Sequence, residues 1–213
     1  MTASRVGICR CASIVVALGL ALPLLVPVSG YAESTDPAAS RINSFYYTLL
    51  EMMKQAKQLG VKGRYDKLAP VLTKTYDLAS MSRIAVGQSW STLSAPQQLS
   101  IVNAFTRMTT ATYASRFDEF SGEQFEILQT VEQPSGDKIV KTRIIQSNGK
   151  PVALNYLMRK SGNDWKVIDV YLDGTISELA SRRAEFGAIL KSGGPDALVS
   201  SLVKQGDKLL AGS

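Results

Sequence analysis

This sequence has no histidine, and its only cysteines, Cys9 and Cys11, lie close to its start. The rest of the chain therefore has no histidine-based triad, no thiol nucleophile and no zinc site of the usual nitrogen and sulfur ligands. No remaining side-chain type has an ordinary pKa near neutrality. Without further cysteines there are no disulfides either, so the fold must be stabilised by its core alone.

The first 32 residues have the three parts of a secretory signal. Arg5 and Arg10 form a basic region, residues 14–28 are apolar, and Gly30-Tyr31-Ala32 places small residues where a signal peptidase cleaves. The apolar run contains two prolines and is shorter than a span of about 20 residues. Both cysteines precede it, so neither is positioned for lipidation. We predict a signal peptide over 1–32 and export to the periplasm of a Gram-negative bacterium, with an uncleaved anchor as the alternative.

The net charge of +6 falls to about +4 once the two signal arginines are removed. This modest excess suits contact with anionic headgroups, whereas no basic run is dense enough for nucleic acid. Basic residues gather between residues 138 and 166, and we select Lys141 and Arg143 as a surface that meets lipid headgroups or partner proteins. The alternative is a solvated strand face whose charges prevent aggregation.

Residues 36–120 show the three- and four-residue apolar spacing of helices. Asp36-Pro37 and the capping box at Ser94-Ala95-Pro96-Gln97 mark two helix starts. Pro70 is expected to kink or interrupt one helix, because proline removes a backbone donor. The predicted helices span about 36–60, 64–75, 77–87 and 94–120.

After Gly122 the apolar period changes to about two, which indicates strands. Short turn sequences separate them, so we predict an antiparallel meander. Helices return in a tail over 176–210, divided at Gly193-Gly194. The fold class is therefore α+β, with one domain over 33–213. The predicted strands span 123–132, 138–146, 151–160 and 165–172.

The third predicted strand alternates cleanly, which places Val152, Leu154, Tyr156 and Met158 on one face. A four-stranded antiparallel sheet with helices on one side is either packed solid or left hollow. Methionines and aromatic residues are plentiful, and methionine adapts to flexible apolar partners. Ordinary core burial is the alternative at each such position.

Asp169 is the one carboxylate placed like a buried acid, within an apolar strand. A lone aspartate in a strand is usually a hydrogen-bonding partner. The sequence offers no histidine or nearby second acid to form an active site with it. An enzyme that uses Asp169 as acid or base remains an alternative.

Three motifs occur in order along the chain. Tyr76-Asp77 precedes a Met-x-Arg-x-x-x-Gly pattern at 81–87, Trp-Lys-Val-x-Asp-Val occupies 165–170, and Gly-Gly-x-Asp-x-Leu occupies 193–198. The series resembles the MlaC-like (toluene-tolerance) family of periplasmic phospholipid carriers. It is also similar to a branch of that family associated with hopanoid biosynthesis. One departure is Tyr76, where the family more often has phenylalanine.

This resemblance implies an NTF2-like antiparallel sheet of four or slightly more strands, wrapped by about six or seven helices around an apolar pocket. It implies a monomeric, non-enzymatic protein without metal or cofactor, whose cargo is a phospholipid or a hopanoid. Its expected partners are an inner-membrane transporter complex and an outer-membrane acceptor or donor. An envelope assembly factor with a solid core is a further alternative. The residues we expect to contact lipid are Met81, Ile84, Val102, Phe105, Met108, Val152, Leu154, Tyr156, Met158, Val167 and Tyr171.

Overall fold

The computed structural model describes residues 36–212, and the expected signal peptide lies outside them. These residues form an α+β fold, as predicted. None of their helices combines the length and apolarity that a membrane crossing requires. The helices are α1 (Pro37–Lys54), α2 (Ala56–Thr75), α3 (Leu78–Val86), the 3₁₀ helix η1 (Gly87–Thr92), α4 (Ala95–Arg116) and α5 (Glu178–Leu210), and the strands are β1 (Gln124–Glu132), β2 (Lys138–Ile145), β3 (Pro151–Ser161), β4 (Asp164–Leu172) and β5 (Ile176–Ser177).

The five strands form one antiparallel sheet in the order β1-β2-β3-β4-β5. This is the meander that the turn sequences predicted. The extra strand β5 has two residues, which pair with the end of β4. A strand that short carries no periodic signal, which is why the sequence did not indicate it.

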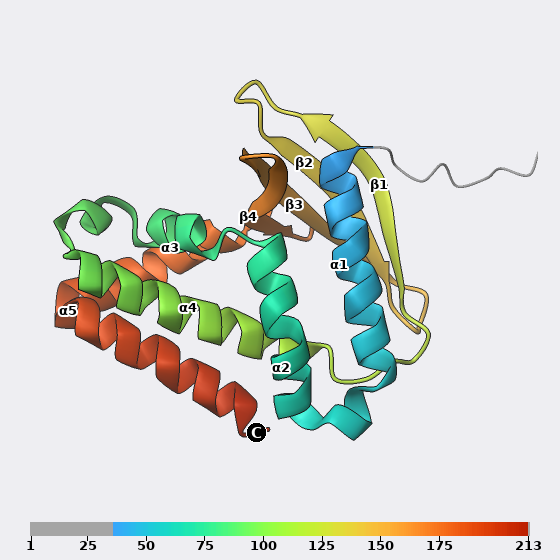
Figure 1. The fold of residues 1–213 in the computed structure, drawn as a ribbon, viewed down its shortest axis with the longest axis horizontal. Coiled ribbons are helices and arrows are strands. Elements are labelled where there is room, and N and C mark those ends of the chain that lie inside the picture. Colours follow the sequence, from blue (N-terminus) through green and yellow to red (C-terminus); the bar gives the residue numbers. More distant parts are fainter. Residues whose placement is uncertain (1–35, 213) are drawn as a thin grey trace, which may run out of the picture. The chain divides into compact units, whose positions relative to one another are not determined.

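The helices gather on one side of the sheet (Figure 1). Helix α1 begins at Asp36, whose carboxylate accepts from the Ala38 and Ala39 amides. Its apolar stripe is fully buried, and the Tyr46 hydroxyl forms a 2.6 Å hydrogen bond with Thr142 of β2. Burial raises the pKa of Tyr46 to about 12, so this hydroxyl is neutral at physiological pH. Helix α1 is thereby fixed against the sheet.

Two of the helices are kinked at glycines with positive φ, Gly60 in α2 and Gly194 in α5. The chain is not interrupted at Pro70, because α2 continues through it. Pro70 has no N–H, so the Asp66 carbonyl lacks its helical hydrogen-bond donor. Both residues are exposed, so water can donate this hydrogen bond instead. Beyond Gly194 the chain turns, and the second half of α5 runs back beside α4 (Figure 1).

A buried arginine connects the kink of α2 to the end of α4. Arg64 is 7 % exposed and donates to the carbonyl oxygens of Ala114, at 2.7 Å, and Ala56, at 2.9 Å. The Ala114 carbonyl lies in the last turn of α4, where the helix dipole favours a cation. The predicted capping box at the start of α4 is confirmed, with Ser94 and Gln97 bonded reciprocally. This helix ends at Arg116, four residues before the predicted end.

Candidate functional site

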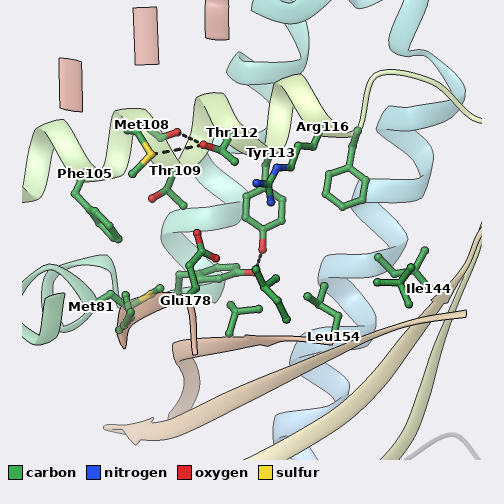
Figure 2. A pocket seen from close by; sticks show the side chains of 16 residues that line it. Met81, Phe105, Met108, Thr109, Thr112, Tyr113, Arg116, Ile144, Leu154 and Glu178 are labelled. Carbon is green, nitrogen blue, oxygen red and sulfur yellow. Dashed lines mark hydrogen bonds between the residues drawn. The ribbon is translucent and has the colours of Figure 1, made fainter. Parts of the chain in front are cut away.

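An apolar cavity of about 200 Å³ lies between α4 and the inner face of the sheet (Figure 2). An engineered apolar cavity of about 150 Å³ stays dry and binds benzene, so a void of this size can accept an apolar group. Its sixteen lining residues are Tyr76, Met81, Phe105, Met108, Thr109, Thr112, Tyr113, Arg116, Phe117, Ile144, Val152, Leu154, Val170, Leu172, Glu178 and Leu179.

The cavity has a closed side and an open side. Buried lining residues such as Phe105, Met108 and Val170 form the closed side. Exposed Arg116 and half-buried Glu178 contact both the cavity and solvent. This arrangement can shelter an apolar chain while a polar group at its end remains in water.

Two tyrosines meet in the cavity wall. The hydroxyls of Tyr76 and Tyr113 are 2.5 Å apart, and the ring of Phe45 packs edge-on against both tyrosine rings. Burial raises the pKa of both hydroxyls, so neither is a phenolate at physiological pH. The pair is therefore a neutral structural contact.

Removing one of these hydroxyls is expected to lower the free energy of unfolding more than removing both. Tyr113→Phe leaves the Tyr76 hydroxyl buried without its partner and should lower the free energy of unfolding by about 1–3 kcal/mol. The double variant, with Tyr76→Phe added, should recover part of that loss. Urea unfolding of the wild type, the two single variants and the double variant completes a double-mutant cycle. Additive losses would show that the two hydroxyls do not depend on each other.

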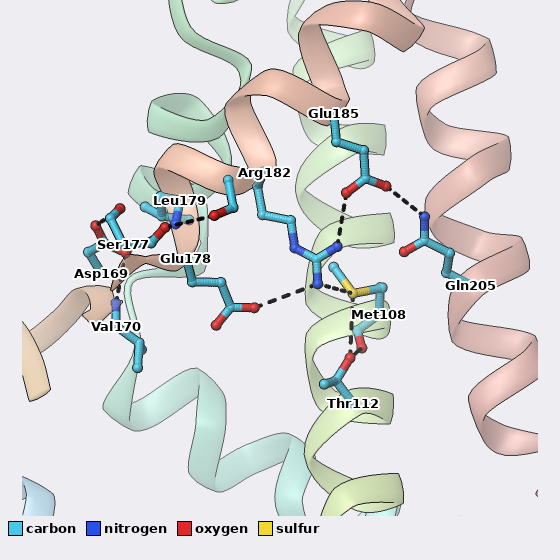
Figure 3. Close-up of polar contacts among 11 residues, drawn as sticks. Met108, Thr112, Asp169, Val170, Ser177, Glu178, Leu179, Arg182, Glu185 and Gln205 are labelled. Atoms are coloured by element: carbon cyan, nitrogen blue, oxygen red, sulfur yellow. Dashed lines mark hydrogen bonds and ion pairs between the residues drawn. The ribbon is translucent and has the colours of Figure 1, made fainter. Parts of the chain in front are cut away.

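Only two of the sixteen lining residues, Arg116 and Glu178, carry a charge. Glu178 Oε1 lies 3.6 Å from the Arg182 guanidinium, which is 3.2 Å from Glu185 Oε2 (Figure 3). Gln205, in the second half of α5, donates to Glu185 at 2.9 Å. This polar network joins the two halves of α5 beside the cavity.

Asp169 anchors the start of α5 and does not line the cavity (Figure 3). Its Oδ1 accepts from the Val170 amide at 2.8 Å and the Leu179 amide at 3.2 Å, and its Oδ2 accepts from the Ser177 hydroxyl at 2.6 Å. The structure thus gives it the role of a hydrogen-bonding partner and no access to a substrate in the cavity. Within residues 36–212, no cluster of three acidic side chains is placed to hold a metal ion.

The structure brings five of the eleven predicted lipid-contacting residues to the cavity and places six elsewhere. Those at the cavity are Met81, Phe105, Met108, Val152 and Leu154. Those that do not line it are Ile84, Val102, Tyr156, Met158, Val167 and Tyr171.

Tyr156 and Met158 lie on the predicted face of β3 but are fully buried core residues. Helix α1 covers that end of the strand, with the ring of Tyr46 5.9 Å from the ring of Tyr156. The face was therefore predicted correctly, but the part of it that stays open was not. Packing by α1 closes one end of the strand, and only Val152 and Leu154 reach the cavity.

A β-bulge separates Val167 from Tyr171 in β4. Met158 pairs with Val167 and Leu157 with Asp169, so the extra residue is Ile168. The bulge shifts the alternation by one, so Val167 and Val170 face the helices. Tyr171 pairs with Asn155 on the outer face, although it was expected to contact lipid. Val167 is a fully buried core residue.

Ile84 of α3 and Val102 of α4 share their helices with cavity-lining residues but do not line the cavity themselves. The Ile84 carbonyl accepts two hydrogen bonds from Arg183, which marks a contact of α3 with α5. Val102 is one helical turn before Phe105, the first cavity residue of α4.

Sequence reasoning also missed polar residues that line the cavity. Thr109, Thr112 and Arg116 continue the spacing from Phe105, but polar side chains usually mark a solvent face.

Lys141 and Arg143 lie on the outer face of the sheet. They flank Thr142, whose side chain points inward to Tyr46 and to the Leu154 carbonyl. Arg143 forms a 2.6 Å ion pair with Glu126. Neither basic residue lines the cavity, so their contact with lipid headgroups or partner proteins stays a prediction.

The sequence and the fold were compared with those of known proteins. The family model described as MlaC protein matches residues 44–204. A search of curated proteins gave no match. Among solved structures, the chain is similar to the phospholipid-binding protein from Ralstonia solanacearum in complex with a phospholipid. The two are 23 % identical with a TM-score of 0.72, over 82 % of this chain and 99 % of the other, so they share a fold.

Proposed function

This chain belongs to the MlaC family, and on that premise we propose that it binds a phospholipid in the cavity between α4 and the sheet. The observation that carries the proposal is the cavity itself, whose lining is predominantly apolar and includes two charged side chains. The Ralstonia protein of the same fold is a phospholipid-binding protein, which supports the same ligand class here.

The energetics favour binding of an acyl chain. Each CH₂ group removed from water contributes about 0.8 kcal/mol, so even part of a chain supplies several kcal/mol. Ligand pockets generally exceed about 300 Å³, so the cavity of about 200 Å³ must widen to hold more than part of one lipid. The flexible side chains of Met81 and Met108 in its wall can adapt to such a change.

The proposed role is transport without catalysis. Asp169, the acid considered for catalysis, is engaged in hydrogen bonds outside the cavity, and the tyrosine hydroxyls in the cavity wall are neutral. We further propose that the protein works in the periplasm as a monomer, after removal of residues 1–32. It would carry lipid between an inner-membrane transporter complex and an outer-membrane acceptor or donor. A hopanoid is the second candidate cargo, because the sequence resembles the branch associated with hopanoid biosynthesis.

Lipid analysis of the protein purified from its own periplasm tests this proposal. Native mass spectrometry should show a protein-bound mass, and organic extraction should release a phospholipid or a hopanoid. A protein that carries no lipid above background, and gains none from phospholipid vesicles, would contradict lipid binding. That outcome is expected if the protein is instead an assembly factor with a solid core.

Reversing the charges on the outer face of the sheet should affect delivery and leave loading unchanged. Weak encounters between proteins are commonly steered by charge, and Lys141 and Arg143 are exposed. The double variant Lys141→Glu/Arg143→Glu is expected to slow lipid transfer to anionic acceptor vesicles about tenfold at low salt. Wild-type transfer should slow as salt exceeds about 0.15 M, where the Debye length is about 8 Å. Transfer that is indifferent to both changes would place docking on the helices instead.

A further inference from the structure

The two charged residues at the cavity have opposite signs and come from different elements. Arg116 is the last residue of α4, and Glu178 is the first residue of α5. Figure 2 shows both side chains beside the cavity, with the hydroxyl of Tyr113 close by. The other fourteen lining residues are uncharged, so these two determine which charges a ligand can place at the opening.

The surroundings of the two residues leave each able to contact a ligand. Arg116 is exposed and forms no ion pair within residues 36–212. The Glu178 side chain is 32 % exposed, and its ion pair with Arg182 measures 3.6 Å at Oε1. Its second oxygen has no donor among the described residues. A guanidinium and a carboxylate oxygen are therefore both available where the cavity meets water.

We propose that this pair selects a zwitterionic phospholipid with a primary ammonium headgroup, an inference that rests on the proposed function. Arg116 contacts the phosphate, because a planar guanidinium binds phosphate oxygens through charge-assisted hydrogen bonds. Glu178 accepts from the ammonium group. Both charges of the ligand then face an opposite charge of the protein.

An anionic headgroup fits the same opening less well. A phosphoglycerol headgroup satisfies Arg116 but brings its negative charge near Glu178 without a compensating cation. Specificity is a difference between two affinities, and an unmatched carboxylate lowers one of them. Because both residues are partly in contact with water, the difference should be modest, about fivefold in favour of the ammonium headgroup.

Competition for one vesicle preparation tests this preference. The mature protein is stripped of lipid by unfolding and refolding, then incubated with vesicles equimolar in phosphatidylethanolamine and phosphatidylglycerol of identical acyl chains. Bound lipid is extracted and quantified. We expect phosphatidylethanolamine to exceed phosphatidylglycerol about fivefold in the wild type. Equal amounts of the two would overturn the inference while supporting phospholipid binding, whereas no bound lipid would overturn the proposed function itself.

Two variants with matched controls assign the preference to the pair. Glu178→Gln should bring the ratio of the two lipids close to one, while Glu185→Gln, which also removes a partner of Arg182 but lies outside the cavity, should keep it. Arg116→Gln should lower the binding of both lipids, since both carry a phosphate. Arg107→Gln, on the same helix and paired with Asp207, should not. Circular dichroism checks that each variant is folded.

An unchanged ratio in Glu178→Gln, or unchanged loading in Arg116→Gln, would overturn the part of the inference assigned to that residue. A shift of the ratio in Glu185→Gln as large as that in Glu178→Gln would also overturn it. That result would assign the effect to the polar network around Arg182.

Discussion

Leu154→Trp is expected to lower phospholipid loading about tenfold or more. Leu154 is 9 % exposed and lies in the cavity wall on β3, opposite α4. An indole at this position would occupy space that we assign to an acyl chain. Fitting a lipid beside it would then meet overpacking costs of about 1–3 kcal/mol, which corresponds to a factor of about five to one hundred and fifty in affinity. Lipid extraction after incubation with vesicles, quantified per protein, measures the change.

Leu157→Trp is the matched control. It introduces the same side chain on the same strand, but Leu157 pairs with Asp169 on the outer face and does not line the cavity. Loading of this variant should equal that of the wild type. If Leu154→Trp also loads normally but melts at a lower temperature, Leu154 is an ordinary core residue and the acyl chain binds elsewhere.

Asp169→Ala should lower the free energy of unfolding by about 3 kcal/mol. This carboxylate is 8 % exposed and accepts hydrogen bonds from Ser177 and Leu179 at the start of α5. Hydrogen bonds to a charged group contribute about 1.5–3 kcal/mol each, and their loss leaves a buried amide without a partner. Urea unfolding measures the loss. Since Glu178 and Leu179 line the cavity, lipid loading should fall as well.

Asp164→Ala provides the comparison within the same strand. Asp164 also forms a polar contact, an ion pair with Arg41 at 2.6 Å, but its side chain is 57 % exposed. Exposed ion pairs contribute at most about 1 kcal/mol, so this variant should be nearly as stable as the wild type. Equal losses in the two variants would show that the anchor at α5 adds nothing beyond an ordinary surface contact.

The secondary structure was predictable because its signals are local. Apolar spacing located α1, α3 and α4, and the capping box fixed the first residue of α4 within one position. Turn sequences after each strand predicted the meander, since short turns join neighbouring antiparallel strands. Each of these signals lies within a few residues of the element it specifies.

The inner face of the sheet was predictable only in part. Alternation along β3 placed Val152 and Leu154 correctly, and it also placed Tyr156 and Met158 on the same face. In β4 the bulge at Ile168 places Tyr171 on the outer face, although it was expected to contact lipid. A single extra residue moves every later side chain of the strand to the opposite face of the sheet. The sequence around Ile168 contains no signal for that insertion.

By itself, the sequence determined the elements, their order, the face of β3 that turns inward and the absence of histidine and cysteine chemistry after the first residues. The tertiary structure alone decided where the cavity lies. Helix α1 fills one end of the inner face, the glycine kink in α5 brings its second half beside α4, and Asp169 fixes Glu178 near the opening. Spacing along a chain records which side of an element is apolar. Whether that side is packed solid or left hollow depends on contacts between segments far apart in sequence.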